Sequence, residues 1–97
     1  MYAAVVRFRF RAPVGEDEVR RIDREVIEPV TRLPGFRAYY GVRVSETEAV
    51  AVHCWDSQAD LERASPQLVA LTQQAVGDQL AGPPERTAGE VVIHRQA

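Results

Sequence analysis

Three consecutive residues near the middle of the chain, His53, Cys54 and Trp55, carry side chains suited to chemistry. Histidine titrates close to neutral pH, so His53 could act as a general base that moves a proton. The alternative is a hydrogen-bonded histidine that is partly buried or lies at a subunit interface. Cys54 would face away from Trp55 in a strand, and no nearby cation in the sequence would activate its thiol. We therefore treat His53 as a candidate catalytic residue and Cys54 as a small core residue.

Aromatic residues are the second group that could form a site. Five aromatic residues could line a pocket for a flat ligand, although side chains of this size also fill hydrophobic cores: Trp55, Tyr40, Tyr39, Phe8 and Phe10. Of these we predict Trp55, Phe8 and Tyr40 as substrate-binding residues. Tyr40 is also a second candidate for moving a proton.

Several kinds of site are not indicated. His53 and His94 are the only histidines, and no carboxylate or thiol accompanies them at ligand spacing, so we expect no metal site. No glycine-rich phosphate loop or dinucleotide fingerprint is present, and we expect no cofactor. Ser57 and Ser65 are explained as helix caps, which leaves no support for a serine nucleophile.

The composition sets broad limits. A chain of 97 residues is expected to form a single domain, residues 1–97. The formal net charge of −2 argues against nucleic acid or an anionic membrane as a partner. No apolar run approaches the roughly 18 residues of a membrane span, and one cysteine excludes an intrachain disulfide. We therefore expect a cytoplasmic protein.

The elements that position these residues follow from hydrophobic periodicity. Alternation predicts strands over residues 2–11, 37–44, 48–55 and 90–95. Helical periodicity predicts a first helix over residues 16–33, with its last turn kinked or tightened at Pro29. A second helical region is expected in two pieces, residues 58–64 and a new helix that starts at Ser65-Pro66. A polar loop is expected over residues 85–89.

Two local signals mark the turns. Pro34-Gly35 should end the first helix, with Gly35 accepting a positive φ. Ser57 with Asp60 three residues later resembles a capping box.

The side chains of each strand divide between two faces. In the first strand Tyr2, Ala4, Val6, Phe8 and Phe10 should share the buried face. In the second strand the expected apolar face consists of Phe36, Ala38, Tyr40, Val42 and Val44.

The order β-α-β-β-α-β predicts an α+β, ferredoxin-like fold with a four-stranded antiparallel sheet. Right-handed crossovers place both helices on one face. The other face would carry Ala3, Val5, Tyr39 and Val92 among arginines, which is too apolar to remain fully hydrated. We predict that a second copy of the chain covers it and forms a homodimer. The arginines of the first strand could instead form an anion-binding patch.

Four segments resemble the dimeric α+β barrel superfamily, in particular antibiotic-biosynthesis-monooxygenase-like domains. They are Val5-Val6-Arg7-Phe8, Pro34-Gly35-Phe36, Trp55-Asp56-Ser57 and Gly89-Glu90-Val91-Val92. The resemblance covers nearly the whole chain and implies a dimeric barrel with a pocket between sheet and helices. The family includes cofactor-independent oxygenases that act on polycyclic phenols and quinones, and haem-degrading enzymes.

The resemblance also implies specific site residues, and this chain departs from some of them. Trp55 matches a pocket tryptophan of the cofactor-independent oxygenases, but the asparagine four residues before it and the phenol six after it are replaced by Ala51 and Leu61. The haem-degrading enzymes use an asparagine and a helix histidine, and this chain has no asparagine. We therefore expect no haem.

Two functional hypotheses remain open. The first is a cofactor-independent monooxygenase that acts on a small aromatic or quinone-like ligand, in which Trp55 packs on substrate and His53 or Tyr40 moves a proton. The second is a non-catalytic ligand-binding or structural homodimer.

Overall fold

The computed structural model describes residues 1–97. Along the chain lie β1 (Tyr2–Arg9), α1 (Glu16–Ile22), η1 (Asp23–Ile27), α2 (Glu28–Val30), β2 (Phe36–Arg43), β3 (Glu48–Trp55), α3 (Gln58–Val76), η2 (Gly77–Gln79) and β4 (Glu85–Glu90). The four strands form one antiparallel sheet in the order β2-β3-β1-β4. The predicted ferredoxin-like α+β fold is confirmed.

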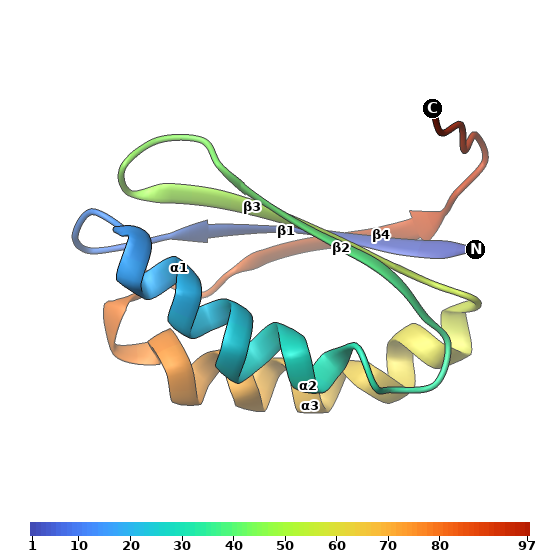
Figure 1. Ribbon diagram of the computed structural model, residues 1–97, viewed down its shortest axis with the longest axis horizontal. Coiled ribbons are helices and arrows are strands. Elements are labelled where there is room, and N and C mark those ends of the chain that lie inside the picture. Colours follow the sequence, from blue (N-terminus) through green and yellow to red (C-terminus); the bar gives the residue numbers. More distant parts are fainter.

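The helices form one layer against one face of the sheet, and no element of the chain covers the other face (Figure 1). We call these the inner and outer faces. As predicted, the alternating side chains of β1 put Ala4 and Val6 on the inner face, where both are buried. The strand ends at Arg9, two residues earlier than expected, and Phe10 makes only an isolated bridge to Leu80.

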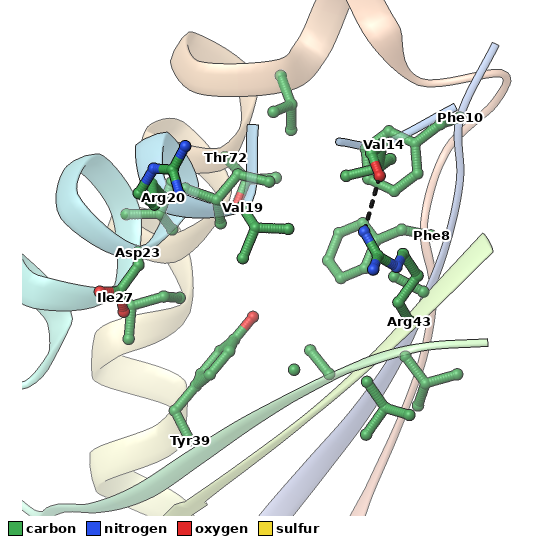
Figure 2. Close-up of a pocket in the computed structure, with 18 of the residues that line it drawn as sticks. Phe8, Phe10, Val14, Val19, Arg20, Asp23, Ile27, Tyr39, Arg43 and Thr72 are labelled. Atoms are coloured by element: carbon green, nitrogen blue, oxygen red, sulfur yellow. Dashed lines mark hydrogen bonds between the residues drawn. The ribbon is translucent and has the colours of Figure 1, made fainter. Parts of the chain in front are cut away.

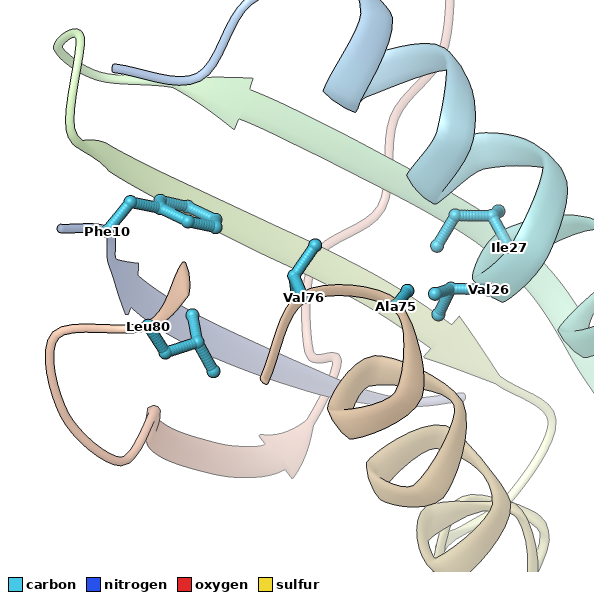
Figure 3. Close-up of a cluster of buried hydrophobic side chains, with 6 residues drawn as sticks. All are labelled: Phe10, Val26, Ile27, Ala75, Val76 and Leu80. Carbon is cyan, nitrogen blue, oxygen red and sulfur yellow. The ribbon is translucent and has the colours of Figure 1, made fainter. Parts of the chain in front are cut away.

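Two buried clusters fill the space between the layers. The first joins the end of β1 to η1 and to the C-terminal end of α3 (Figure 3), and consists of Phe10, Val26, Ile27, Ala75, Val76 and Leu80. The second lies at the other end of the sheet and consists of Ala4, Val30, Trp55, Leu61 and Ala64. The larger of the two cavities described below lies beside the first cluster, whose Phe10 and Val76 are among the residues that line it.

The first helical segment is continuous from Glu16 to Val30, and Pro29 affects it differently from the prediction. The turn Asp23–Ile27 is a wide π-helix rather than a tightened turn, and the N–H of Glu28 bonds back to the carbonyl of Asp23. Proline cannot donate to the carbonyl four residues earlier, and its ring would clash with that carbonyl. The wider turn relieves this conflict within the helix.

A β-bulge changes the faces of the second strand. Phe36 pairs with Trp55, but Ala38 pairs with Cys54, so Arg37 is the extra residue. Beyond the bulge every side chain is on the face opposite to the predicted one. Tyr39 pairs with His53 on the inner face, and Tyr40 pairs with Val52 on the outer face. The prediction that Tyr40 and Val42 share the buried face is therefore wrong.

The second long helix is a single element, which corrects the prediction of two pieces. Pro66 lies inside α3 and has no N–H to donate, while the Ser65 hydroxyl donates to the carbonyl of Leu61 (2.9 Å) instead of capping a new helix. Both halves of α3 bury apolar residues, Leu61 on one side of Pro66 and Val76 on the other. This packing outweighs one lost helical hydrogen bond.

The last strand spans residues 85–90, where a polar loop was predicted, and residues 91–97 lie beyond it. All six residues of β4 are exposed, as expected for an edge strand whose backbone rather than its side chains supplies the pairing. It pairs only with β1, and this pairing ends where β1 starts, with Tyr2 opposite Glu90. His94 and Val92 are therefore outside the sheet, and the prediction that they belong to its fourth strand is wrong.

The turn at Gly35 and the Ser57 N-cap are confirmed, but the capping box is incomplete, because the Asp60 carboxylate accepts from the Ser57 hydroxyl and not from its backbone N–H. Gly35 has a φ of 81°, the only positive φ in the chain. The Ser57 hydroxyl oxygen accepts a hydrogen bond from the backbone N–H of Asp60 (3.2 Å) at the start of α3.

Candidate functional site

A cavity of about 530 Å³ opens between the inner face of the sheet and the first helical segment (Figure 2). This volume is within the range of small-molecule sites. Thirteen of its twenty lining residues are hydrophobic. The sheet contributes Phe8 and Tyr39, and the helix contributes Val19, Ile22 and Ile27. We call this space the large cavity; its lining favours an apolar, flat ligand.

Arg43 lies at the rim of the large cavity. Its guanidinium donates to the carbonyl of Val14 (3.0 Å; Figure 2) and lies 3.7 Å from the carboxylate of Glu16. These contacts tie the end of β2 to the loop before α1. Arg43 faces inward because of the bulge at Arg37.

Tyr39 supplies a polar group in this apolar lining. Its ring rises from β2 and its hydroxyl points into the large cavity (Figure 2). Burial raises the pKa of the Tyr39 hydroxyl to about 12. The hydroxyl is therefore un-ionised at neutral pH and can donate a hydrogen bond to a ligand oxygen.

His53 stacks against Tyr39 from the neighbouring strand, with ring centroids 6.0 Å apart and planes inclined by 6°. Its side chain is only 4% exposed. The Nε1–H of Trp55 donates to His53 Nδ1 (2.8 Å), so Nδ1 carries no proton. In the neutral ring the proton must then be on Nε2. Burial, and secondarily the positive charge of Arg86, lowers the pKa of His53 to about 4, so the ring is neutral at pH 7.

A second, smaller cavity of about 210 Å³ lies against His53. It shares part of its lining with the large cavity, including Phe8, Val26 and Tyr39, so the two spaces are adjacent. His53 Nε2 has no hydrogen-bond partner in the protein and is not sealed from solvent, which places it at this small cavity. The site therefore combines a large apolar space with a small one that a neutral histidine lines.

The structure brings together some of the predicted site residues. Phe8 lines both cavities, and His53 lines the small one. Trp55 lines neither; it is 0% exposed within the second core cluster, where its ring packs edge-on against Phe36. Tyr40 lies on the outer face and is 58% exposed, on the side of the sheet opposite to His53.

Tyr39 was considered among the pocket aromatics but was not predicted as a site residue, because strict alternation placed it on the outer face. The signal that could have found it is the spacing of Phe36 and Tyr39, since both can face the same side only if the strand contains a bulge. Arg86 was missed as well, because β4 was predicted to begin after it.

Two observations concern other kinds of site. No group of three or more histidine, cysteine, aspartate or glutamate side chains is arranged to hold a metal ion. None of the helices has both the length and the apolar character needed to cross a lipid bilayer.

The sequence matches no protein-family model and no curated protein. Solved structures, in contrast, match over nearly the full length. A protein of unknown function from Nitrosomonas europaea, NE2512, superimposes with a TM-score of 0.78 at 14% identity, covering 99% of this chain and 93% of that one. SnoaB, a cofactor-independent oxygenase from Streptomyces nogalater, gives 0.74 at 18% identity, covering 99% and 94%.

A third structure has a ligand. The monooxygenase from the gene ActVA-Orf6 of Streptomyces coelicolor, in complex with nanaomycin D, gives a TM-score of 0.69 at 21% identity, covering 98% of this chain and 92% of that one. At these identities the comparison establishes shape rather than activity. The predicted resemblance is confirmed at that level: the chain has the ferredoxin-like fold of the antibiotic biosynthesis monooxygenase structures.

Proposed function

We propose that this protein is a cofactor-independent monooxygenase that binds a flat phenolic or quinone-like ligand in the large cavity. The observation that carries the proposal is the cavity itself, an apolar space of about 530 Å³ with the Tyr39 hydroxyl pointing into it. The oxygenases that share the fold support the same reaction class.

The residues suggest a division of roles. The aromatic body of the ligand would pack between Phe8 and the helix side chains Val19 and Ile22. The neutral Tyr39 hydroxyl would donate to a ligand oxygen and stabilise negative charge on it. When a ring methylene loses a proton to solvent, the electron-rich ring anion can react with dioxygen directly. One oxygen atom becomes the carbonyl at that carbon, and the other leaves as water with the two hydrogens of the former methylene.

His53 would act in this scheme as a hydrogen-bond donor. Because His53 Nδ1 accepts a hydrogen bond from Trp55, the accessible Nε2 carries the ring proton. The Nε2–H group can therefore donate a hydrogen bond to a polar ligand atom in the small cavity. A neutral histidine can polarise an oxygen in this way without becoming charged. Trp55 would be a positioning residue, because it fixes the tautomer of His53 and contacts neither cavity.

The experiment combines binding with turnover. Hydroxyanthrones and naphthohydroquinones should quench the fluorescence of Trp55, the only tryptophan, and should cause protein-dependent oxygen uptake. Val19→Phe, which fills part of the large cavity, should weaken binding at least tenfold. Val92→Phe, in the exposed segment after β4, is the matched control and should not. No quenching by any member of the panel would contradict the proposal.

A second candidate function is a non-catalytic ligand-binding or structural homodimer. The outer face favours association, because Val5, Tyr40 and Val42 are 45%, 58% and 52% exposed on it and Ala3 lies beside them. Apolar sheet surfaces of this kind are usually covered. Light scattering should give twice the mass of 10.8 kDa at micromolar concentration. Ligand quenching without oxygen uptake would select the non-catalytic function.

A further inference from the structure

The small cavity differs in charge from the large one. Asp23, Glu16 and Glu48 are among the residues that line the large cavity, whereas no aspartate or glutamate lines the small one. The small cavity instead has hydrogen-bond donors from two strands, His53 on β3 and Arg86 on β4, together with the uncharged polar residues Ser65, Thr72 and Gln73 of α3. Such a lining favours an anion over a cation or a purely apolar group.

Arg86 is a positive charge without a counterion. Eight of the twelve arginines form an ion pair with a carboxylate, but the guanidinium of Arg86 bonds only to the Ser65 hydroxyl (3.2 Å). That hydroxyl already donates to the carbonyl of Leu61, so it acts as an acceptor toward Arg86. The remaining N–H groups of Arg86 are free to bind a ligand.

His53 is the second observation, independent of Arg86. It is a polar side chain that is more than nine-tenths buried, with one ring nitrogen held by Trp55 and the other unpartnered at the small cavity. Because Nε2–H still reaches solvent in the small cavity, a ligand acceptor can replace water there. The positive charge of Arg86 also contributes to the low pKa of His53, which indicates that the two groups sense one another across this space.

From this lining we infer that the small cavity is a carboxylate subsite, in which Arg86 and His53 Nε2–H bind the acidic group of an aromatic acid. The inference rests on the proposed function, since the aromatic body of the same ligand would occupy the adjacent large cavity. Arginine suits this role because its guanidinium can form two parallel hydrogen bonds with a carboxylate. Arg86 would then select acidic ligands over neutral ones of the same shape.

Calorimetry with a matched pair of probes tests this inference. 1-Naphthaleneacetate and 1-naphthaleneacetamide have nearly the same shape and differ in charge. The wild-type protein should bind the acetate at least tenfold more tightly than the amide. In Arg86→Gln this preference should fall to less than twofold, while affinity for the amide stays within twofold of wild type. Arg86 is exposed on an edge strand, so the variant is expected to fold, which circular dichroism would verify.

The control is Arg9→Gln, which removes the same charge from the outer side of β1, where Arg9 pairs with Glu85. It should keep the preference for the acetate. A second readout is the NMR signal of the His53 ring, whose pKa the acetate should raise and the amide should not, because a nearby negative charge favours the protonated ring.

Each result has a distinct meaning. Equal binding of acetate and amide by the wild type would overturn the carboxylate subsite and leave the aromatic ligand site intact. Acetate ion alone binding as tightly as the naphthalene acid would identify a free-anion site and would also overturn the inference. Binding of neither naphthalene probe would overturn the proposed aromatic site together with its acidic subsite.

Discussion

Lowering the pH from 7 to 5 should destabilise this protein through one buried side chain, His53. In the folded protein its pKa is about 4, and in the unfolded chain it returns to about 6.5. Between these values the unfolded state binds a proton that the folded state does not, so acid favours unfolding. The stabilisation is complete above pH 6.5 and is lost as the pH falls toward 4.

The size of the effect follows from the shift. A difference of about 2.5 pH units, at about 1.4 kcal/mol per unit, gives an upper limit of about 3.5 kcal/mol over the whole interval. Integration from pH 7 to pH 5 gives about 2 kcal/mol. This is a large fraction of the 5–15 kcal/mol that is typical of a domain. The charged groups that face His53 are few, since Arg86 on β4 and the un-ionised Tyr39 on β2 are the titratable residues that line the same small cavity.

Urea unfolding at a fixed protein concentration, repeated from pH 7 to pH 5, would measure this loss in the free energy of unfolding. His53→Gln can still accept from Trp55 Nε1–H but does not titrate, so its free energy of unfolding should fall by about 2 kcal/mol less over this range. His94→Gln, in the exposed C-terminal segment, is the control and should behave as wild type. Parallel curves for the wild type and His53→Gln would refute the reasoning, because they would show that folding does not alter the proton affinity of His53.

Three further predictions concern other parts of the structure. Trp55→Phe should lower the free energy of unfolding by about 2–4 kcal/mol, because it leaves a void in a fully buried cluster. It also removes the N–H that donates to His53 Nδ1, so two-dimensional NMR should show both tautomers of the His53 ring. Gly35→Ala should lower the free energy of unfolding by at least about 1 kcal/mol, because φ is 81° and an added Cβ would overlap the Asp60 carboxylate, whereas Gly82→Ala, with open space around it, should be nearly neutral in thermal unfolding. Val42→Glu should convert the predicted dimer to a monomer in light scattering, because it places a charge among the exposed apolar side chains of the outer face; an unchanged mass would contradict association through that face.

The sequence was sufficient to predict the elements in which the pattern of apolar and polar side chains matches the pattern of burial. β1 alternates because one face is buried and the other is more exposed, and β3, which is apolar on both faces as a central strand should be, was predicted with its observed bounds. The caps at Ser57 and the positive φ at Gly35 depend on local chemistry that the residue types encode directly. These features required no knowledge of tertiary packing.

The errors arose where tertiary contacts decide the outcome. Pro66 reads as a helix start, but the burial of Leu61 and Val76 keeps α3 continuous across it. The polar residues of β4 read as a loop, yet their backbone completes the sheet against β1. In both cases a local preference of about 1–3 kcal/mol is outweighed by packing or backbone pairing that involves distant residues.

The bulge at Arg37 had the largest consequence for function. One extra residue exchanges the faces of all that follow it, so Tyr39 rather than Tyr40 stacks on His53, and the guanidinium of Arg43 reaches the rim of the large cavity. The same exchange moves Tyr40 and Val42 to the outer face and makes that face more apolar. The bulge thus places the neutral Tyr39 phenol in the candidate site and an apolar patch on the surface proposed for dimerisation. A variant that removes the bulge should therefore impair both ligand binding and dimerisation.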